Sequence, residues 1–132
     1  MENTKPIAVL LVDDEDRFRA TTTATLKRRG FEVHAASSGE EAIEELQEKD
    51  IDVVVLDIKM PGMNGVETLQ AIQQLNPQAT CVMITGFASS DLVDESLSSG
   101  ALMCLSKPFG IREIEDVVSS ILEDLREPVP AA

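Results

Sequence analysis

Short apolar segments alternate with segments of helical pattern along this chain, and this alternation constrains the fold more than any other feature. Four runs of mostly aliphatic residues predict strands that are buried on both faces. They are residues 7–12, 53–56, 81–84 and 102–105. A fifth run, Glu32–Ala36, is more polar, which is typical of an edge strand.

Five helical patterns lie between and after these runs. Residues 15–29 begin acidic and end basic before Gly30, which suits the helix dipole and a C-terminal glycine. Ser38 can cap a helix that runs through Leu46, and Ser89 or Ser90 can cap one that ends at Gly100. Asn76-Pro77 ends the pattern 65–75, and residues 111–125 carry one apolar stripe. Five strand–helix pairs predict an α/β fold of the (βα)5 type, with a doubly wound, five-stranded parallel sheet and right-handed crossovers.

The length and charge of the chain limit its class of function. At 132 residues we expect one domain with a single sizeable core. A net charge of −13 argues against direct binding to nucleic acid or to an anionic membrane, because both are polyanions. No signal-peptide pattern and no stretch of membrane-spanning length is present, so the sequence predicts a cytoplasmic protein.

The cysteines and the one histidine do not indicate a catalytic or zinc site. Cys81 and Cys104 lie inside apolar runs, so we expect two buried thiols in a reducing compartment. Neither a second cysteine pair nor a histidine cluster accompanies them. His34 falls in a predicted strand, where we expect it to be partly exposed.

Polar and charged residues stand where the predicted buried strands end, and together they indicate the chemistry. Asp13 and Asp14 follow the first strand, Asp57 the third, Thr85 the fourth, and Lys107 the fifth. The carboxyl ends of parallel strands share one edge of a sheet, where α/β proteins place their ligands. Each residue alone has an ordinary explanation, such as a helix cap for Asp13-Asp14 or turn chemistry for Asp57. All five together at one edge indicate a functional site.

Three carboxylates held together either retain a proton or recruit a cation. Oxygen ligands of this kind favour Mg²⁺, which commonly links carboxylates to phosphate. Asp57 can act as a nucleophile and form an aspartyl phosphate. Lys107 and the Thr85 hydroxyl then suit the phosphoryl oxygens.

The segments VDDE, VVVLDIKMPGMNG, ITGFA and LSKPF, in this order, resemble the receiver domain of two-component response regulators over residues 7–125. The resemblance implies a flavodoxin-like topology, with a receiver domain at residues 7–126, an N-terminal extension at 1–6 and a tail or linker at 127–132. It also implies a phosphorylation-controlled switch that accepts a phosphoryl group from the phosphohistidine of a sensor histidine kinase or a phosphotransfer protein. Such a switch is not an enzyme toward external substrates. It transmits to a downstream protein effector or to an output domain, and homodimers are possible.

The family roles carry over to the matching positions. Asp57 becomes the phosphoacceptor, Asp14, Asp57 and the backbone carbonyl of Lys59 become ligands of Mg²⁺, and Asp13 acts mainly through a bound water. Lys107 pairs with Asp57 and then with the phosphoryl group. The resemblance further implies a cis bond before Pro108 and a role for Gly86 in leaving room for the phosphoryl group.

One position departs from the family pattern. Three residues before the lysine, the family usually has Tyr or Phe, and this chain has Cys104. A thiol cannot make the same exposed-to-buried movement as an aromatic ring, and whether Phe87 replaces it is open. We therefore expect phosphorylation with a smaller or differently routed conformational response.

Three other classes of function remain as alternatives. A phosphorylation-independent, receiver-like scaffold is favoured only by Cys104. A small Mg²⁺-dependent phosphatase working through Asp57 would need a general acid and a substrate-enclosing cap, and neither is visible. A flavin-binding module would need aromatic rings to stack the flavin, whereas the chain has no Trp or Tyr.

Overall fold

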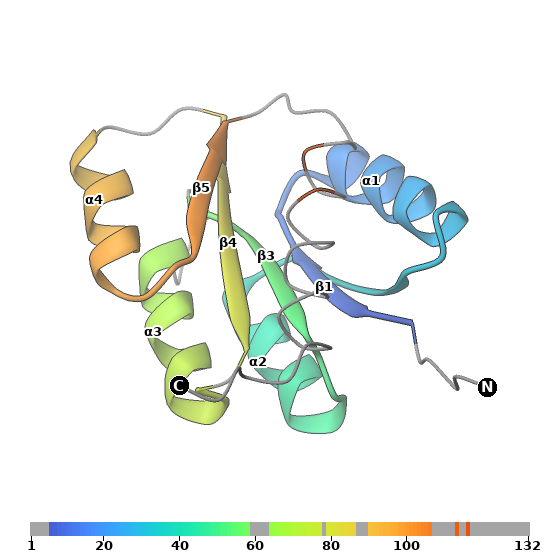
Figure 1. Ribbon diagram of the computed structural model, residues 1–132, viewed down its shortest axis with the longest axis horizontal. Helices are drawn as coiled ribbons and strands as arrows, with labels where there is room; N and C mark the ends of the chain where they lie inside the picture. Colours follow the sequence, from blue (N-terminus) through green and yellow to red (C-terminus); the bar gives the residue numbers. More distant parts are fainter. Residues whose placement is uncertain are drawn as a thin grey trace, which may run out of the picture.

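The computed structural model describes residues 6–58, 64–77, 79–86, 90–106, 113 and 116, and its strands form one parallel sheet. The strand order is β2-β1-β3-β4-β5, with helices on both faces (Figure 1). This confirms the predicted doubly wound α/β fold and the edge position of the second strand. The elements are β1 Ala8–Val12, α1 Asp16–Arg28, β2 Glu32–Ala36, α2 Gly39–Glu48, β3 Val53–Asp57, α3 Gly65–Leu75, β4 Thr80–Thr85, α4 Ser90–Ser98 and β5 Met103–Ser106.

Two hydrophobic clusters cover the two faces of the sheet. Alternate residues of β1 point to opposite faces, so that Leu10 packs with Leu69 of α3 and Leu11 packs with Leu26 of α1. All of β1 and β3 is buried, as the continuous apolar runs predict. Burial on both faces leaves only the ends of these strands available for polar chemistry.

The helix ends follow the capping signals of the sequence. Ser38 caps α2 through its side chain, and Asn64 and Glu67 form a complete capping box at the start of α3. Gly30 and Gly100 have φ of 98° and 111°, and these left-handed conformations end α1 and α4. The observed bounds of α1 lie one residue inside the predicted 15–29, because Glu15 and Arg29 are the cap residues.

The last predicted helix, at residues 111–125, lies mostly outside the described residues. Glu113 and Asp116 are described, and both are helical. None of the described helices has the length and apolar character needed to cross a bilayer.

Candidate functional site

Three carboxylates meet at the C-terminal edge of the sheet. Ligand oxygens of Asp13, Asp14 and Asp57 lie within 4.8 Å of one another. Asp13 and Asp57 are 0% and 4% exposed, whereas Asp14 is open to solvent. The sequence expectation that two adjacent strands bring these residues together is confirmed. Two carboxylates of the cluster are therefore buried, and an incoming group can reach the cluster from the side of Asp14.

Asp57 is fixed by its position in the centre of the sheet. It is the last residue of β3, it stands opposite Ile84 of β4, and the Ile58 N–H donates to the Ile84 carbonyl at 2.9 Å. The Gly65 N–H then donates to the Ile58 carbonyl at 2.8 Å, which ties the start of α3 to the end of β3. These hydrogen bonds fix the backbone on the C-terminal side of Asp57.

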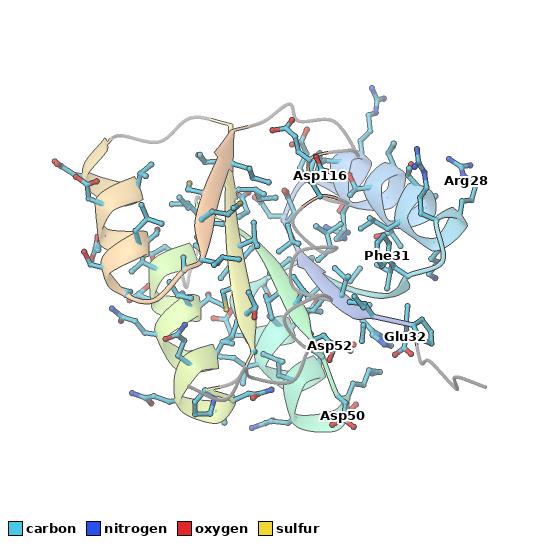
Figure 2. All side chains as sticks on the ribbon, in the orientation of Figure 1. Arg28, Phe31, Glu32, Asp50, Asp52 and Asp116 are labelled. Atoms are coloured by element: carbon cyan, nitrogen blue, oxygen red, sulfur yellow. The ribbon has the colours of Figure 1, made fainter. Side chains whose placement is uncertain are left out.

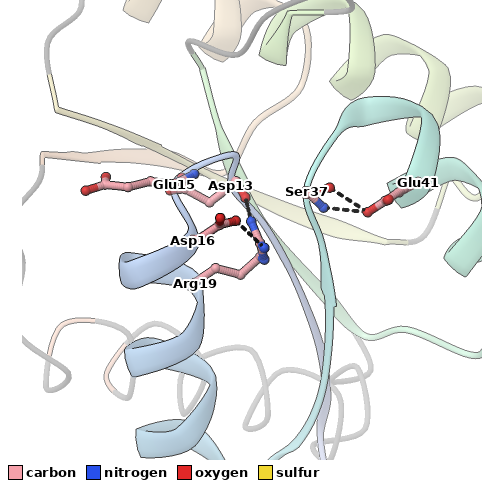
Figure 3. Close-up of polar contacts among 6 residues, drawn as sticks. All are labelled: Asp13, Glu15, Asp16, Arg19, Ser37 and Glu41. Carbon is pink, nitrogen blue, oxygen red and sulfur yellow. Dashed lines mark hydrogen bonds and ion pairs between the residues drawn. The ribbon is translucent and has the colours of Figure 1, made fainter.

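Asp13 is held by the turn that leads from β1 into α1 (Figure 3). Its N–H donates to the Ala36 carbonyl at 3.1 Å, and its Oδ1 accepts from the Glu15 N–H at 2.8 Å. Arg19 reaches back from α1, with Nη1 donating to the Asp13 carbonyl and Nη2 to Asp16 Oδ1, both at 2.7 Å. Arg19 thus fixes the backbone that presents the carboxylates. The i,i+3 spacing of Asp16 and Arg19 is the sequence signal that could have indicated this contact.

A second polar contact lies beside this turn, after β2. Glu41 Oε1 accepts from the Ser37 N–H at 2.7 Å and from the Ser37 hydroxyl at 2.9 Å (Figure 3). Both hydrogen bonds lower the pKa of the Glu41 carboxyl, the one from the Ser37 N–H more than the one from the hydroxyl. The positive charge of Arg19 lowers this pKa further. Sequence reasoning identified the Ser38–Glu41 cap and missed Ser37, whose contact depends on how the chain enters α2.

Thr85 ends β4 at the same edge of the sheet. It is 6% exposed and pairs with Ser106, one register step beyond the Asp57–Ile84 pair. Gly86 follows it and is exposed. The other predicted site residues, Lys59 and Lys107, lie outside the described residues, as do Phe87 and Pro108.

The cysteines behave differently from each other. Cys81 is buried, and burial raises the pKa of its thiol to about 12. Cys104 is only half-buried, so the expectation of two buried thiols is wrong for this residue, although burial also raises its pKa. Cys104 lies on β5, which pairs only with β4 among the described strands, and its side chain packs against one of the two core clusters. His34 is partly exposed on β2, as expected, with Nε2 at 2.7 Å from Glu32 Oε2.

The three carboxylates suit a divalent cation. Mg²⁺ holds oxygen ligands at about 2.0–2.1 Å, so opposite ligands stand about 4 Å apart. The observed spread of up to 4.8 Å is close to this value and is compatible with one carboxylate acting through a water. Hard oxygen donors alone, without nitrogen or sulfur, favour Mg²⁺ or Ca²⁺ over zinc or copper.

Comparisons with known proteins agree with this geometry. Residues 9–119 match the family model of the response regulator receiver domain. The chain is 32% identical over 114 residues to sporulation initiation phosphotransferase F of Bacillus subtilis. The alignment covers 86% of this chain and 92% of that protein. It is 35% identical over 120 residues to the transcriptional regulatory protein ZraR of Klebsiella oxytoca, covering 91% of this chain but only 27% of that relative.

The solved structures lead to the same family. A CheY-like response regulator receiver domain protein from Methanospirillum hungatei superposes with a TM-score of 0.87 at 29% identity, covering 94% of this chain and all of that one. The chemotaxis protein CheY4 of Vibrio cholerae superposes with a TM-score of 0.83, also at 29% identity, covering 89% of this chain and 99% of that one. This chain belongs to the response regulator receiver domains of two-component systems.

Proposed function

We propose that this chain is a phosphorylation-controlled signalling switch with Asp57 as its phosphoacceptor. The observation that carries the proposal is the buried Asp57 carboxylate at the end of β3, within 4.8 Å of the carboxylates of Asp13 and Asp14. The phosphoryl donor is the phosphohistidine of a sensor kinase or of a phosphotransfer protein. We place the limits of the switch at residues 7 and 126.

The transfer exchanges one bond for another. A carboxylate oxygen of Asp57 attacks phosphorus, the N–P bond of the phosphohistidine breaks, and an O–P bond forms. The electron pair of the broken bond stays on the imidazole nitrogen of the donor. Burial of Asp57 strips water from the nucleophile, and the rigid end of β3 holds it in line.

The other site residues handle the charge that the phosphoryl group brings. Asp13, Asp14, Asp57 and the Lys59 carbonyl would hold Mg²⁺, which supplies positive charge to the phosphoryl oxygens when bound. The Thr85 hydroxyl donates to one phosphoryl oxygen, and Lys107 pairs with another. The coupling from Thr85 to β5 passes Cys104 in place of an aromatic ring. We therefore propose that the conformational response to phosphorylation is smaller or differently routed.

The decisive experiment measures intact mass after incubation with acetyl phosphate and Mg²⁺. Wild type should gain one phosphoryl group that hydroxylamine removes, and Asp57→Asn should gain none. Asp50→Asn is the matched control, because Asp50 is exposed and precedes β3, at the opposite edge of the sheet (Figure 2). Label retained in Asp57→Asn contradicts the assignment.

The same samples separate the alternative functions. Continuous turnover of a soluble phosphomonoester by wild type, lost in Asp57→Asn, would support a phosphatase. Absence of both an adduct and acetyl phosphate hydrolysis would support a phosphorylation-independent scaffold. For the phosphorylation-controlled switch proposed above, the output partner is a protein effector or an output domain in the same polypeptide.

A further inference from the structure

A groove separates α1 from the edge strand β2, at the side of the sheet away from β3, β4 and β5. Its volume is about 350 Å³, and it is open to solvent. The small side chains of Ala20, Ala24 and Ala35 line it, together with Thr23 and the charged side chains of Asp16, Arg19 and Lys27. Except for Arg19, which supports the Asp13 backbone, these residues have no part in the phosphorylation site.

The backbone of β2 offers hydrogen-bonding groups along this groove. The Glu32 N–H donates to the Ile7 carbonyl, and the Ala36 carbonyl accepts from the Asp13 N–H, so the even-numbered residues of β2 bond to β1. In a parallel sheet the intervening residues then direct their N–H and C=O groups the other way. Those residues are Val33 and Ala35, and no described strand pairs with that side of β2. An incoming strand finds two donors and two acceptors there.

The side chains around this edge leave room for such a strand. Ala35 is exposed, and Ala20 and Ala24 are exposed on the facing side of α1. Natural sheets usually protect an edge strand with bulky charges, proline or a covering element. On its α1 side this edge instead carries a methyl group at Ala35. A helix, about 10 Å wide, is a poorer match to this groove than a strand, which adds at about 4.8 Å from its neighbour.

The charge of α1 indicates the chemistry of the partner. Three charged residues line the groove, and two of them, Asp16 and Arg19, pair with each other at 2.7 Å, so Lys27 supplies its net positive charge. Lys27 lines the groove, is exposed and forms no ion pair with any described residue. A lysine beside an unpaired strand edge favours carboxylates on the side chains of the added strand that face α1, which are those at alternate positions.

We propose that this groove binds an extended acidic segment of a partner protein, which adds to the sheet as a strand beside β2. Main-chain hydrogen bonds to Val33 and Ala35 provide the pairing, and Lys27 selects for carboxylates on the α1 side. This surface lies beyond the phosphorylation site, and the proposal requires no phosphoryl transfer. Recognition by strand addition is a common mode of peptide binding.

The test is an NMR titration of the ¹⁵N-labelled full chain with a synthetic octapeptide of alternating threonine and glutamate. The amide signals of Val33, Ala35 and the groove-facing residues of α1 should shift in a saturable way. A peptide with lysine in place of glutamate, and one with proline at its two central positions, should not cause these shifts. If the alternating acidic peptide causes no saturable shift up to about 1 mM, the weak end of specific binding, the proposal is overturned.

Two exposed cations of α1 form a matched pair of variants. Lys27→Glu should weaken binding about tenfold or more, as expected when like charges meet. Arg28→Glu makes the same charge change at a residue that does not line the groove and points outward at the end of α1 (Figure 2), and it should have little effect. Equal losses in the two variants would show unspecific attraction and overturn the proposal.

Ala35→Pro tests the strand pairing directly. It removes the outward N–H of residue 35 and leaves the hydrogen bonds of Glu32 and Ala36 to β1 in place. Binding should be lost while the amide spectrum of β3 and β4 stays native-like. Unchanged affinity in this variant would exclude strand addition, and Lys27→Glu keeps the proposal testable if Ala35→Pro does not fold.

Discussion

At the scale of single residues, Gly65 is the position where local preference and tertiary structure disagree. Gly65 is the first residue of α3, and glycine is intrinsically a poorer helix former than alanine. A Cβ there would lie 2.5 Å from Ile58 Cα and 2.8 Å from the Ile58 carbonyl oxygen. Both are backbone atoms, which cannot move aside without displacing the end of β3 next to Asp57.

We therefore expect Gly65→Ala to lower the free energy of unfolding by about 1–3 kcal/mol, the usual cost of overpacking. Urea denaturation measures this value. Gly30→Ala is the control, because its Cβ would meet nothing within 4 Å and any loss there comes from the left-handed φ alone. A rise in stability for Gly65→Ala would contradict the close approach of α3 to β3.

The carboxyl group of Glu41 makes the stability of the fold depend on pH. The N–H and hydroxyl of Ser37 lower the pKa of the Glu41 carboxyl in the folded chain below its usual value of 4.5. The folded state therefore binds the proton less readily than the unfolded state. The stabilisation is present above the unfolded pKa and is lost as the pH falls through the folded one.

We expect Glu41→Gln to reduce the loss of stability below about pH 4.5 relative to wild type, with the urea midpoint measured from pH 7 down to pH 3. Glu40→Gln, one residue earlier in the same helix turn, controls for the removal of a negative charge. Parallel pH curves for wild type and Glu41→Gln would show that the contact with Ser37 does not hold the carboxylate in solution.

At the scale of elements, the start of α3 depends on a capping box. Asn64 Oδ1 accepts from the Glu67 N–H at 2.9 Å, and Glu67 Oε1 accepts from the Asn64 N–H at 3.1 Å. Asn64→Ala removes the side-chain half of this pair and should cost about 1 kcal/mol of stability. Asn64→Ser keeps an acceptor and should lie within a few tenths of a kcal/mol of wild type. Chemical denaturation of the three proteins measures both differences, and equal values for Ala and Ser would contradict the cap.

The elements also show how far the sequence predicts this structure. Continuous apolar runs correctly predicted β1, β3 and β4 as buried strands, because a strand covered on both faces excludes polar residues along its length. The site position followed, since parallel strands bring their carboxyl ends to one edge. The contact of Arg19 with the Asp13 carbonyl was not predicted, and neither was the close approach of Gly65 to the backbone of Ile58. Both depend on how the elements pack after they form. The half-exposure of Cys104 was missed because an apolar run does not distinguish β5, at the sheet edge, from a central strand.

At the scale of the whole molecule, acidic charge is concentrated where a cation would neutralise it. The chain carries a net charge of −13, and three of its carboxylates lie within 4.8 Å of one another at one edge. Two of them are buried, where water screens repulsion poorly. A cation between these carboxylates, or the loss of one of their charges, would relieve their mutual repulsion.

Thermal unfolding in EDTA and in Mg²⁺ tests this balance. In EDTA, we expect Asp57→Asn to be more stable than wild type by on the order of 1–3 kcal/mol, because the substitution removes one of three mutually repelling charges. Added Mg²⁺ should stabilise wild type, by about 2.7 kcal/mol at a hundredfold excess over Kd, and should stabilise Asp14→Ala much less. Asp50→Asn, which changes an exposed carboxylate outside the cluster, should respond to Mg²⁺ as wild type does. Lower stability of Asp57→Asn in EDTA would contradict the argument that the three carboxylates repel one another.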